Sequence, residues 1–107
     1  MNRWNIPAQL EQDVIQRDRY FVYRGIELRA TSQPRRSRPS WEHIVDDARI
    51  VSIGNIARCC TSCNASKGAK DISVWLDSSY CKRRGIILAS VADVVKRAIE
   101  DPPKVKT

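Results

Sequence analysis

The sequence predicts an α+β fold in which two short strands and one helix form a central unit flanked by other helices. Residues 41–45 and Ile56–Cys60 are rich in residue types that favour strands. Thr61 and Ser62 directly follow the second run and are good helix caps, and Gly68 is a residue type that ends helices. At 107 residues the chain has room for one domain with a modest core.

The first predicted helix spans residues 6–17, with Asn5 as its cap and Pro7 in its first turn. Its apolar stripe consists of Ile6, Leu10, Val14 and Ile15. Residues 20–23 are of types that favour strands, and Gly25 predicts a tight turn into residues 26–28. Residues 29–40 have no periodicity and carry two prolines and four arginines, which predicts a loop.

The second half of the chain predicts mainly helices. Residues 49–53 suit a strand or a turn, and the acids Asp46 and Asp47 end the strand before them. Asp71 caps a predicted helix whose apolar residues recur at helical spacing: Ile72, Trp75, Leu76 and Tyr80. Ser90 begins a last helix with an inward face of Val91, Val94, Val95 and Ile99. We therefore expect one domain over residues 1–100 and a frayed tail over residues 101–107.

Charge makes nucleic acid the first partner to consider. Nineteen Lys and Arg against twelve acids give a net charge of +7 and a pI near 9.6, which suits a polyanion, although solvated surface charges would give the same count. The chain shows no apolar run of membrane-spanning length and no apolar core of a signal peptide, so we expect a cytoplasmic protein. In that compartment the four cysteines are expected as reduced thiols or a metal knuckle.

The residues around the two predicted strands suit a metal-assisted attack on a phosphodiester. His43 is the only histidine, and a neutral imidazole can accept a proton from water near pH 7. Glu42 and Asn64 offer the hard oxygen ligands that Mg²⁺ prefers, and one or two such ligands suffice. Lys67 lies three residues beyond Asn64 on the same helix face, where it could meet a phosphate.

Strand geometry sets a condition on this site. Neighbours on a regular strand point to opposite faces, so Glu42 and His43 can serve one phosphate only if the strand ends or bends there. Three arginines lie just before that strand and are expected to contact the DNA backbone: Arg35, Arg36 and Arg38. A second basic run, Lys82, Arg83 and Arg84, is open to two interpretations, DNA contact or simple stabilisation of a helix C-terminus.

Together these residues resemble the HNH endonucleases, which have the ββα-metal fold. The resemblance runs through residues 41–44, Asn55 and Cys60–Gly68 and covers about residues 13–76. It implies a small phage-like or prophage-like enzyme that cuts DNA with one divalent cation, Mg²⁺ or alternatively Mn²⁺, and leaves 5′-phosphate and 3′-hydroxyl ends. It further implies that His43 is the general base and that Asn55 braces the loop between the strands and orients the backbone of His43.

The same resemblance assigns the metal ligands. Glu42 stands where the family usually has Asp, and Asn64 would be the second ligand of the catalytic cation. Many members also hold their fold with a zinc ion between two Cys-x-x-Cys knuckles, and Cys60 and Cys63 match the second knuckle. The first would fall at residues 21–24, where both cysteines are replaced, so the usual four-thiolate site cannot form. Apolar packing around Phe21 is expected in its place, with Cys59 or Cys81 as conceivable substitute ligands.

Two other functions stay open from the sequence. One is a DNA-binding module that keeps the HNH fold without its activity, which the missing knuckle and the Glu in place of Asp would explain. The other is a zinc-dependent interaction module built on the cysteines. Partners that act in phage packaging or nicking are conceivable for an enzyme of this type.

Overall fold

The structure, a computed structural model that describes residues 5–25 and 38–105, is built around two antiparallel strands and the helix that follows them. Strand β1 (Pro39–His43) pairs with β2 (Ile56–Cys60), so that His43 lies opposite Ile56. Helix α2 (Thr61–Lys67) begins at the residue after β2. The predicted α+β class is confirmed, as is the order of two strands followed by a helix.

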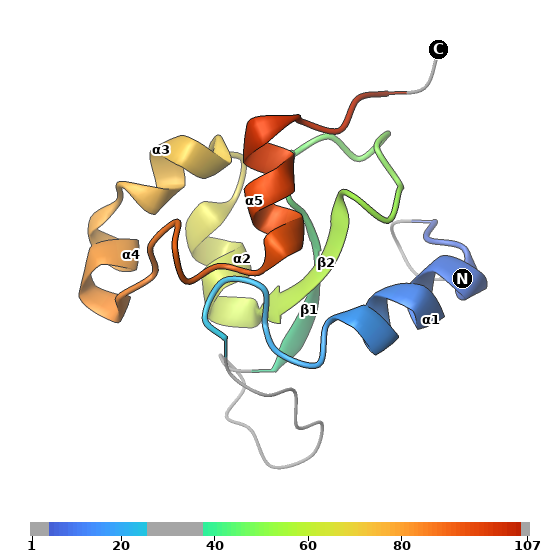
Figure 1. Cartoon of the computed structure of the whole chain (residues 1–107), viewed down its shortest axis with the longest axis horizontal. Coiled ribbons are helices and arrows are strands. Elements are labelled where there is room, and N and C mark those ends of the chain that lie inside the picture. Colours follow the sequence, from blue (N-terminus) through green and yellow to red (C-terminus); the bar gives the residue numbers. More distant parts are fainter. Residues whose placement is uncertain (1–4, 26–37, 106–107) are drawn as a thin grey trace.

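Four further helices surround this unit: α1 (Ala8–Arg17), α3 (Ile72–Leu76), α4 (Ser79–Arg84) and α5 (Asp93–Glu100). Figure 1 shows α1 on one side of the strand pair and α2 to α5 on the other. Residues 101–105 are neither helix nor strand, and residues 26–28 of the predicted turn lie outside the described residues. No helix among the described residues is long and apolar enough to cross a membrane.

The ends of the central unit have clear local causes. The bounds of β2 are those predicted, whereas β1 lies two residues before the predicted 41–45 and starts inside the predicted loop. Proline lacks an N–H and is tolerated at a strand start, so Pro39 can open β1. The Ile44 N–H donates to Asn55 O at 3.0 Å and the chain bends from Ile44 onward, which ends the strand. Helix α2 is capped by the Cys60 thiol rather than by Thr61 or Ser62, and it ends at Gly68 as predicted.

Other predicted elements are shifted. The first helix starts at Ala8 because Asn5 has φ +56° and Pro7 is the cap. Residues 20–23 do not form a strand: a turn forms in which the Gly25 N–H donates to Phe21 O at 2.8 Å. Residues 49–53 form no strand, so the turn alternative holds.

The two predicted C-terminal helices also differ from expectation. Asp71 caps α3 as predicted, but the helix stops at Leu76, and Ser78 caps the separate helix α4 through a bond from the Cys81 N–H. The last helix begins at Asp93, because the Ser90 hydroxyl is bonded to the backbone of Ile87 in the preceding turn.

The strand pair separates two apolar clusters. The larger one lies on the α2 side and is centred on Trp75, which is fully buried and meets Tyr23 edge to face at 4.8 Å. The smaller one lies on the α1 side and contains Ile6, Val14 and Ile56. Strand β2 contributes to both clusters, with Ile56 in the smaller one and Ala57, Cys59 and Cys60 in the larger one.

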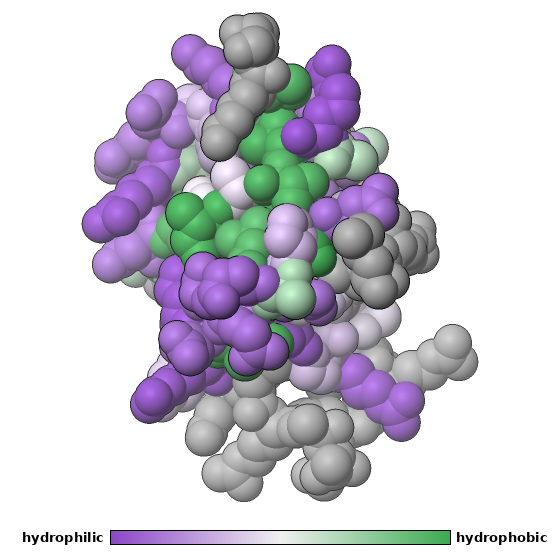
Figure 2. Space-filling model, turned by 90° about the vertical axis from the view of Figure 1, so that its right-hand side faces the viewer, coloured by the Kyte–Doolittle hydropathy of each residue, from purple (hydrophilic) through white to green (hydrophobic). Residues whose placement is uncertain are grey.

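Part of the surface is apolar. Figure 2 views the molecule from the side of α1 and the β1–β2 loop and shows a band of apolar residues with polar residues on either side. The exposed large apolar residues include Ile15 of α1 and Ile53 of the β1–β2 loop. An apolar band offers phosphate no partner, so a surface for a polyanion has to be sought elsewhere.

We expect Trp75→Ala to lower the free energy of unfolding by about 3–5 kcal/mol, because it removes a buried aromatic ring and leaves a cavity. The indole Nε1 also loses its bond to Ser66 Oγ, which measures 3.0 Å. Urea unfolding followed by circular dichroism measures the change. Val74→Ala is the matched control, since this neighbour on the same helix is 63% exposed and should change stability by less than about 0.5 kcal/mol. Equal effects of the two substitutions would contradict the assignment of the core.

Candidate functional site

Three of the predicted site residues, Glu42, His43 and Lys67, come together where β1 ends against α2. His43 is the last residue of β1 and Glu42 precedes it, and each is 6% exposed. The bend that follows begins at Ile44. The strand therefore ends directly after Glu42 and His43, which is the condition that strand geometry sets for a site shared by these two residues.

Asn55 ties the loop between β1 and β2 together. Its Oδ1 accepts the Val45 N–H at 2.8 Å, and its Nδ2 donates to Val45 O and to Ile50 O, both at 3.1 Å. Its backbone carbonyl accepts the Ile44 N–H at 3.0 Å, and the whole residue is buried. Three of these bonds fix the two residues that directly follow His43, and the fourth holds Ile50 in the far part of the loop.

The surroundings of His43 favour its neutral form. Burial lowers the pKa of His43, and the nearby charge of Lys67 lowers it further, while Asp46 and Asp47 act in the opposite direction. The Nε2 atom is itself buried. A neutral imidazole at pH 7 can accept a proton, which is the property a general base needs.

Glu42 has two partners inside the protein. Its Oε2 accepts a hydrogen bond from the Tyr23 hydroxyl at 2.8 Å and lies 3.4 Å from the Nζ of Lys67. Burial raises the pKa of Glu42, and both Lys67 and Tyr23 oppose that shift. Tyr23 was not predicted as part of the site, because its run of strand formers gave no sign of a turn that would bring it beside β1.

Lys67 is enclosed by protein. Its side chain is fully buried, and besides Glu42 its ammonium contacts the His43 carbonyl oxygen at 3.3 Å. The sequence predicts that Lys67 meets a phosphate; in the structure it shares the α2 face with Asn64 but points into the β1–α2 interface. In this position it is a counter-ion of Glu42. Spacing along the helix could not predict this role, because it does not tell which element the helix face packs against.

Asn64 also connects α2 to β1. Its Nδ2 donates to Ser40 Oγ and to Trp41 O, both at 2.8 Å. Asn64 thus lies against the start of β1, and Lys67, one helical turn later, lies against its end. The two side chains hold the helix along the strand.

The chain has the types of ligand atom that a magnesium ion prefers, but the structure does not bring them together at one binding site. Carboxylate and amide oxygens suit Mg²⁺. However, Glu42 is paired with Lys67 and Tyr23 near the end of β1, whereas Asn64 is bonded through Nδ2 to the start of that strand. Among residues 5–25 and 38–105, no three His, Cys, Asp or Glu side chains come together as a metal site. The described arrangement therefore does not fit a divalent cation on Glu42 and Asn64.

The cysteines are buried free thiols in the structure. The Cys60 sulphur accepts the Cys63 N–H at 3.4 Å, and the Cys63 side chain and Arg24 lower the pKa of the Cys60 thiol. The same contact with Cys60 raises the pKa of Cys63, whose sulphur also accepts the Tyr80 hydroxyl at 3.4 Å. Arg24 thus places a cation beside Cys60 at a position where the resemblance expects a zinc-binding cysteine. Phe21, at the other such position, is buried in the larger cluster.

A basic surface runs from the start of α2 to α4. The Arg38 carbonyl accepts the Thr61 N–H at 3.0 Å, and Ser62 is hydrogen-bonded to the Tyr80 hydroxyl. The Arg84 guanidinium lies 3.7 Å from the centroid of the Tyr80 ring. We call this the α2–α4 surface and define it by its exposed cations, Arg38, Lys82, Arg83 and Arg84. Arg35 and Arg36 lie outside the described residues.

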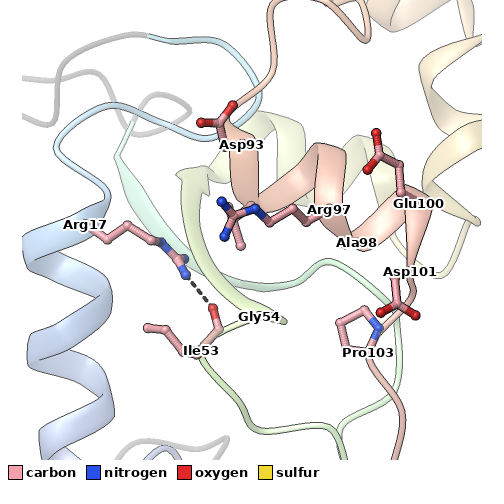
Figure 3. A pocket seen from close by; sticks show the side chains of 10 residues that line it. Arg17, Ile53, Gly54, Asp93, Arg97, Ala98, Glu100, Asp101 and Pro103 are labelled. Carbon is pink, nitrogen blue, oxygen red and sulfur yellow. Dashed lines mark hydrogen bonds between the residues drawn. The ribbon is translucent and has the colours of Figure 1, made fainter.

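A cavity of about 420 Å³ lies away from these residues, between α1, the β1–β2 loop and α5. Its charged lining consists of Arg17, Arg97, Asp93, Glu100 and Asp101, as Figure 3 shows. Arg17 is occupied, since it bonds the carbonyls of Ile53 and Ile56. Charges of both signs line the cavity, so it favours neither an anion nor a cation, and none of the predicted site residues in the described part of the chain lines it.

The chain matches no family model, no curated protein and no solved structure. Its function must therefore be inferred from its own residues and their geometry.

We expect Asn55→Ala to lower the free energy of unfolding by about 3 kcal/mol, because one buried and two partly buried backbone groups lose their partner. The measurement is urea unfolding at pH 7. Gln9→Ala serves as the control, since its side chain bonds only Asp13 on the exposed face of α1. A loss no larger than that of the control would show that Asn55 does not brace the loop.

Proposed function

We propose that the chain is a small HNH-type endonuclease that hydrolyses DNA phosphodiester bonds with His43 as general base. The observation that carries the proposal is the way the backbone around His43 is held. Its carbonyl accepts a bond from Lys67, and the next two residues are fixed by Asn55. A base on a rigid backbone at the end of a strand is suited to take a proton from one defined water.

The chemistry assigned to the chain's own residues is proton transfer. The lowered pKa of His43 supports a neutral imidazole at pH 7, which accepts the proton of the attacking water. The product ends would be 5′-phosphate and 3′-hydroxyl, as the resemblance implies. A divalent cation, when bound, would neutralise charge on the phosphate and on the leaving oxygen. Because Glu42 and Asn64 do not form its site in the described arrangement, no step is assigned to it.

The distribution of charge supports DNA as the substrate. Residues 48–70 and 78–92 contain no Asp or Glu, and these stretches include α2 and α4. The α2–α4 surface begins at Arg38, at the start of β1, whereas His43 lies at its end. The five residue steps from Arg38 to His43 span about 17 Å in extended chain, close to five base-pair rises of B-DNA at about 3.4 Å each. Cations at that separation can hold the backbone a few nucleotides from the scissile phosphate.

A second candidate function is a DNA-binding module of the same fold without catalytic activity. One observation favours it: the carboxylate expected to bind the catalytic cation is buried and paired with Lys67. DNA binding through the α2–α4 surface would not depend on that pair.

A plasmid-nicking assay separates the two functions. With Mg²⁺ or Mn²⁺ we expect the wild type to nick supercoiled DNA, EDTA to abolish nicking, and His43→Ala to lower the rate by about 10²- to 10⁴-fold. The variant should still bind DNA, which confirms that it is folded. Binding without nicking by the wild type would refute the endonuclease and favour the binding module.

We expect Arg84→Ala to weaken binding of a short duplex about equally for different sequences and to reduce the slope of log K against log salt by about 1, as loss of one phosphate contact does. Fluorescence anisotropy at several salt concentrations measures both quantities. Lys104→Ala removes the same charge from the exposed C-terminal segment and is the control. If both variants change the slope equally, the α2–α4 surface is not the binding surface.

A further inference from the structure

We propose that Lys67 is a built-in counter-ion of Glu42 and that a divalent cation binds at Glu42 only in competition with the ammonium group of Lys67. The proposal rests on the proposed function in one respect, that Glu42 is the carboxylate such a cation would use. It goes further in naming the group that opposes metal binding.

Burial is the first step of the inference. Glu42 is 6% exposed and the side chain of Lys67 is fully buried, so neither charge is adequately solvated by water. A charge in such a place persists only with an opposite charge or with several hydrogen bonds. Lys67 therefore opposes the rise that burial causes in the pKa of Glu42.

The other neighbours of Glu42 do not replace Lys67. Tyr23 donates a hydrogen bond but carries no charge, because burial raises the pKa of its hydroxyl well above the usual value. Asp46 is an acid and adds to the negative charge around Glu42. Among the described residues that shift the pKa of Glu42, Lys67 is the one that supplies positive charge.

Distance makes the ammonium and a metal ion competitors. The Nζ of Lys67 lies 3.4 Å from Oε2 of Glu42. A magnesium ion bound to that oxygen would be about 2.1 Å from it and so at most about 5.5 Å from the ammonium. Three positive charges would then share one carboxylate in a buried site where they are poorly screened. The cation can bind well only if the ammonium moves away or its charge is removed.

The experiment measures Mn²⁺ binding by calorimetry at pH 7.5 without DNA, for the wild type, Lys67→Met and the double variant Glu42→Gln/Lys67→Met. Methionine keeps much of the length of the lysine stem and removes its charge. We expect Lys67→Met to bind one Mn²⁺ at least tenfold more tightly than the wild type, and the double variant to lose this gain. No tighter binding by Lys67→Met, or a gain that survives in the double variant, would overturn the proposal.

A measurement on the wild type keeps the proposal testable if Lys67→Met does not fold. Acetic anhydride modifies exposed amines, and mass spectrometry reports the extent at each lysine. Saturating Mn²⁺ should raise the modification of Lys67 severalfold, because the cation displaces the enclosed ammonium, and should leave the exposed Lys104 unchanged. An unchanged rate at Lys67 with Mn²⁺ bound would contradict the competition.

Failure of this proposal and failure of the proposed function give different results. A protein that shows the Mn²⁺ competition but never nicks DNA is not an endonuclease, and Lys67 keeps its role. A protein that nicks DNA while Lys67→Met leaves the Mn²⁺ affinity unchanged is an endonuclease in which Lys67 does not oppose the metal.

Discussion

The contact between Lys67 of α2 and Glu42 of β1 is the interaction on which the site depends most. It places an ion pair inside the interface between the helix and the strand, and the Tyr23 hydroxyl brings the turn at residues 22–24 to the same carboxylate. A buried pair of this kind adds little net stability, because desolvation offsets the attraction. Its effect is to fix position: a shift of α2 by one turn would leave both charges buried without a partner.

This pair and Asn55 act on the two sides of His43. Lys67 holds the carbonyl of His43 itself, whereas Asn55 holds the next two residues and, through Ile50, the far part of the loop. The backbone around the only histidine is therefore fixed by groups from α2 and from the end of the β1–β2 loop. If His43 is a base, its position is set by buried polar contacts rather than by apolar packing.

The sequence predicts the central unit well because the signals there are local. A run of strand formers gives the bounds of β2, Gly68 ends α2 and Asp71 caps α3. The failures involve contacts between distant residues. Residues 20–23 have strand propensity, but the turn that Gly25 closes starts at Phe21, four residues earlier, and the Val22 N–H bonds Arg58 O, a distant residue that no local pattern indicates.

The same limit applies to the candidate site. Spacing places Asn64 and Lys67 on one helix face, but it does not tell whether that face meets solvent or β1. The place of Asn55 at the loop end agrees with the resemblance, whereas the pairing of Lys67 with Glu42 depends on how α2 packs. Side-chain direction within an interface is decided by tertiary contacts, and periodicity contains no information on it.

Two positions in this chain share one physical feature. Where the resemblance expects a zinc-binding cysteine, Arg24 lies beside the Cys60 thiol, and where it expects a catalytic cation, Lys67 lies beside Glu42. In each case a cation that belongs to the chain stands next to an acidic group that a metal could otherwise neutralise. A tethered cation cannot dissociate, so it stabilises the fold without any metal, but it also opposes metal binding at the same group.

At Cys60 a cationic side chain in place of a zinc ion would remove no catalytic group, since a structural zinc ion takes no part in catalysis. For Glu42 the consequence is larger, because a tethered ammonium cannot polarise water as a bound divalent cation does. Whether Lys67 yields its place at Glu42 is therefore the physical difference between an endonuclease and a DNA-binding module built on the same fold.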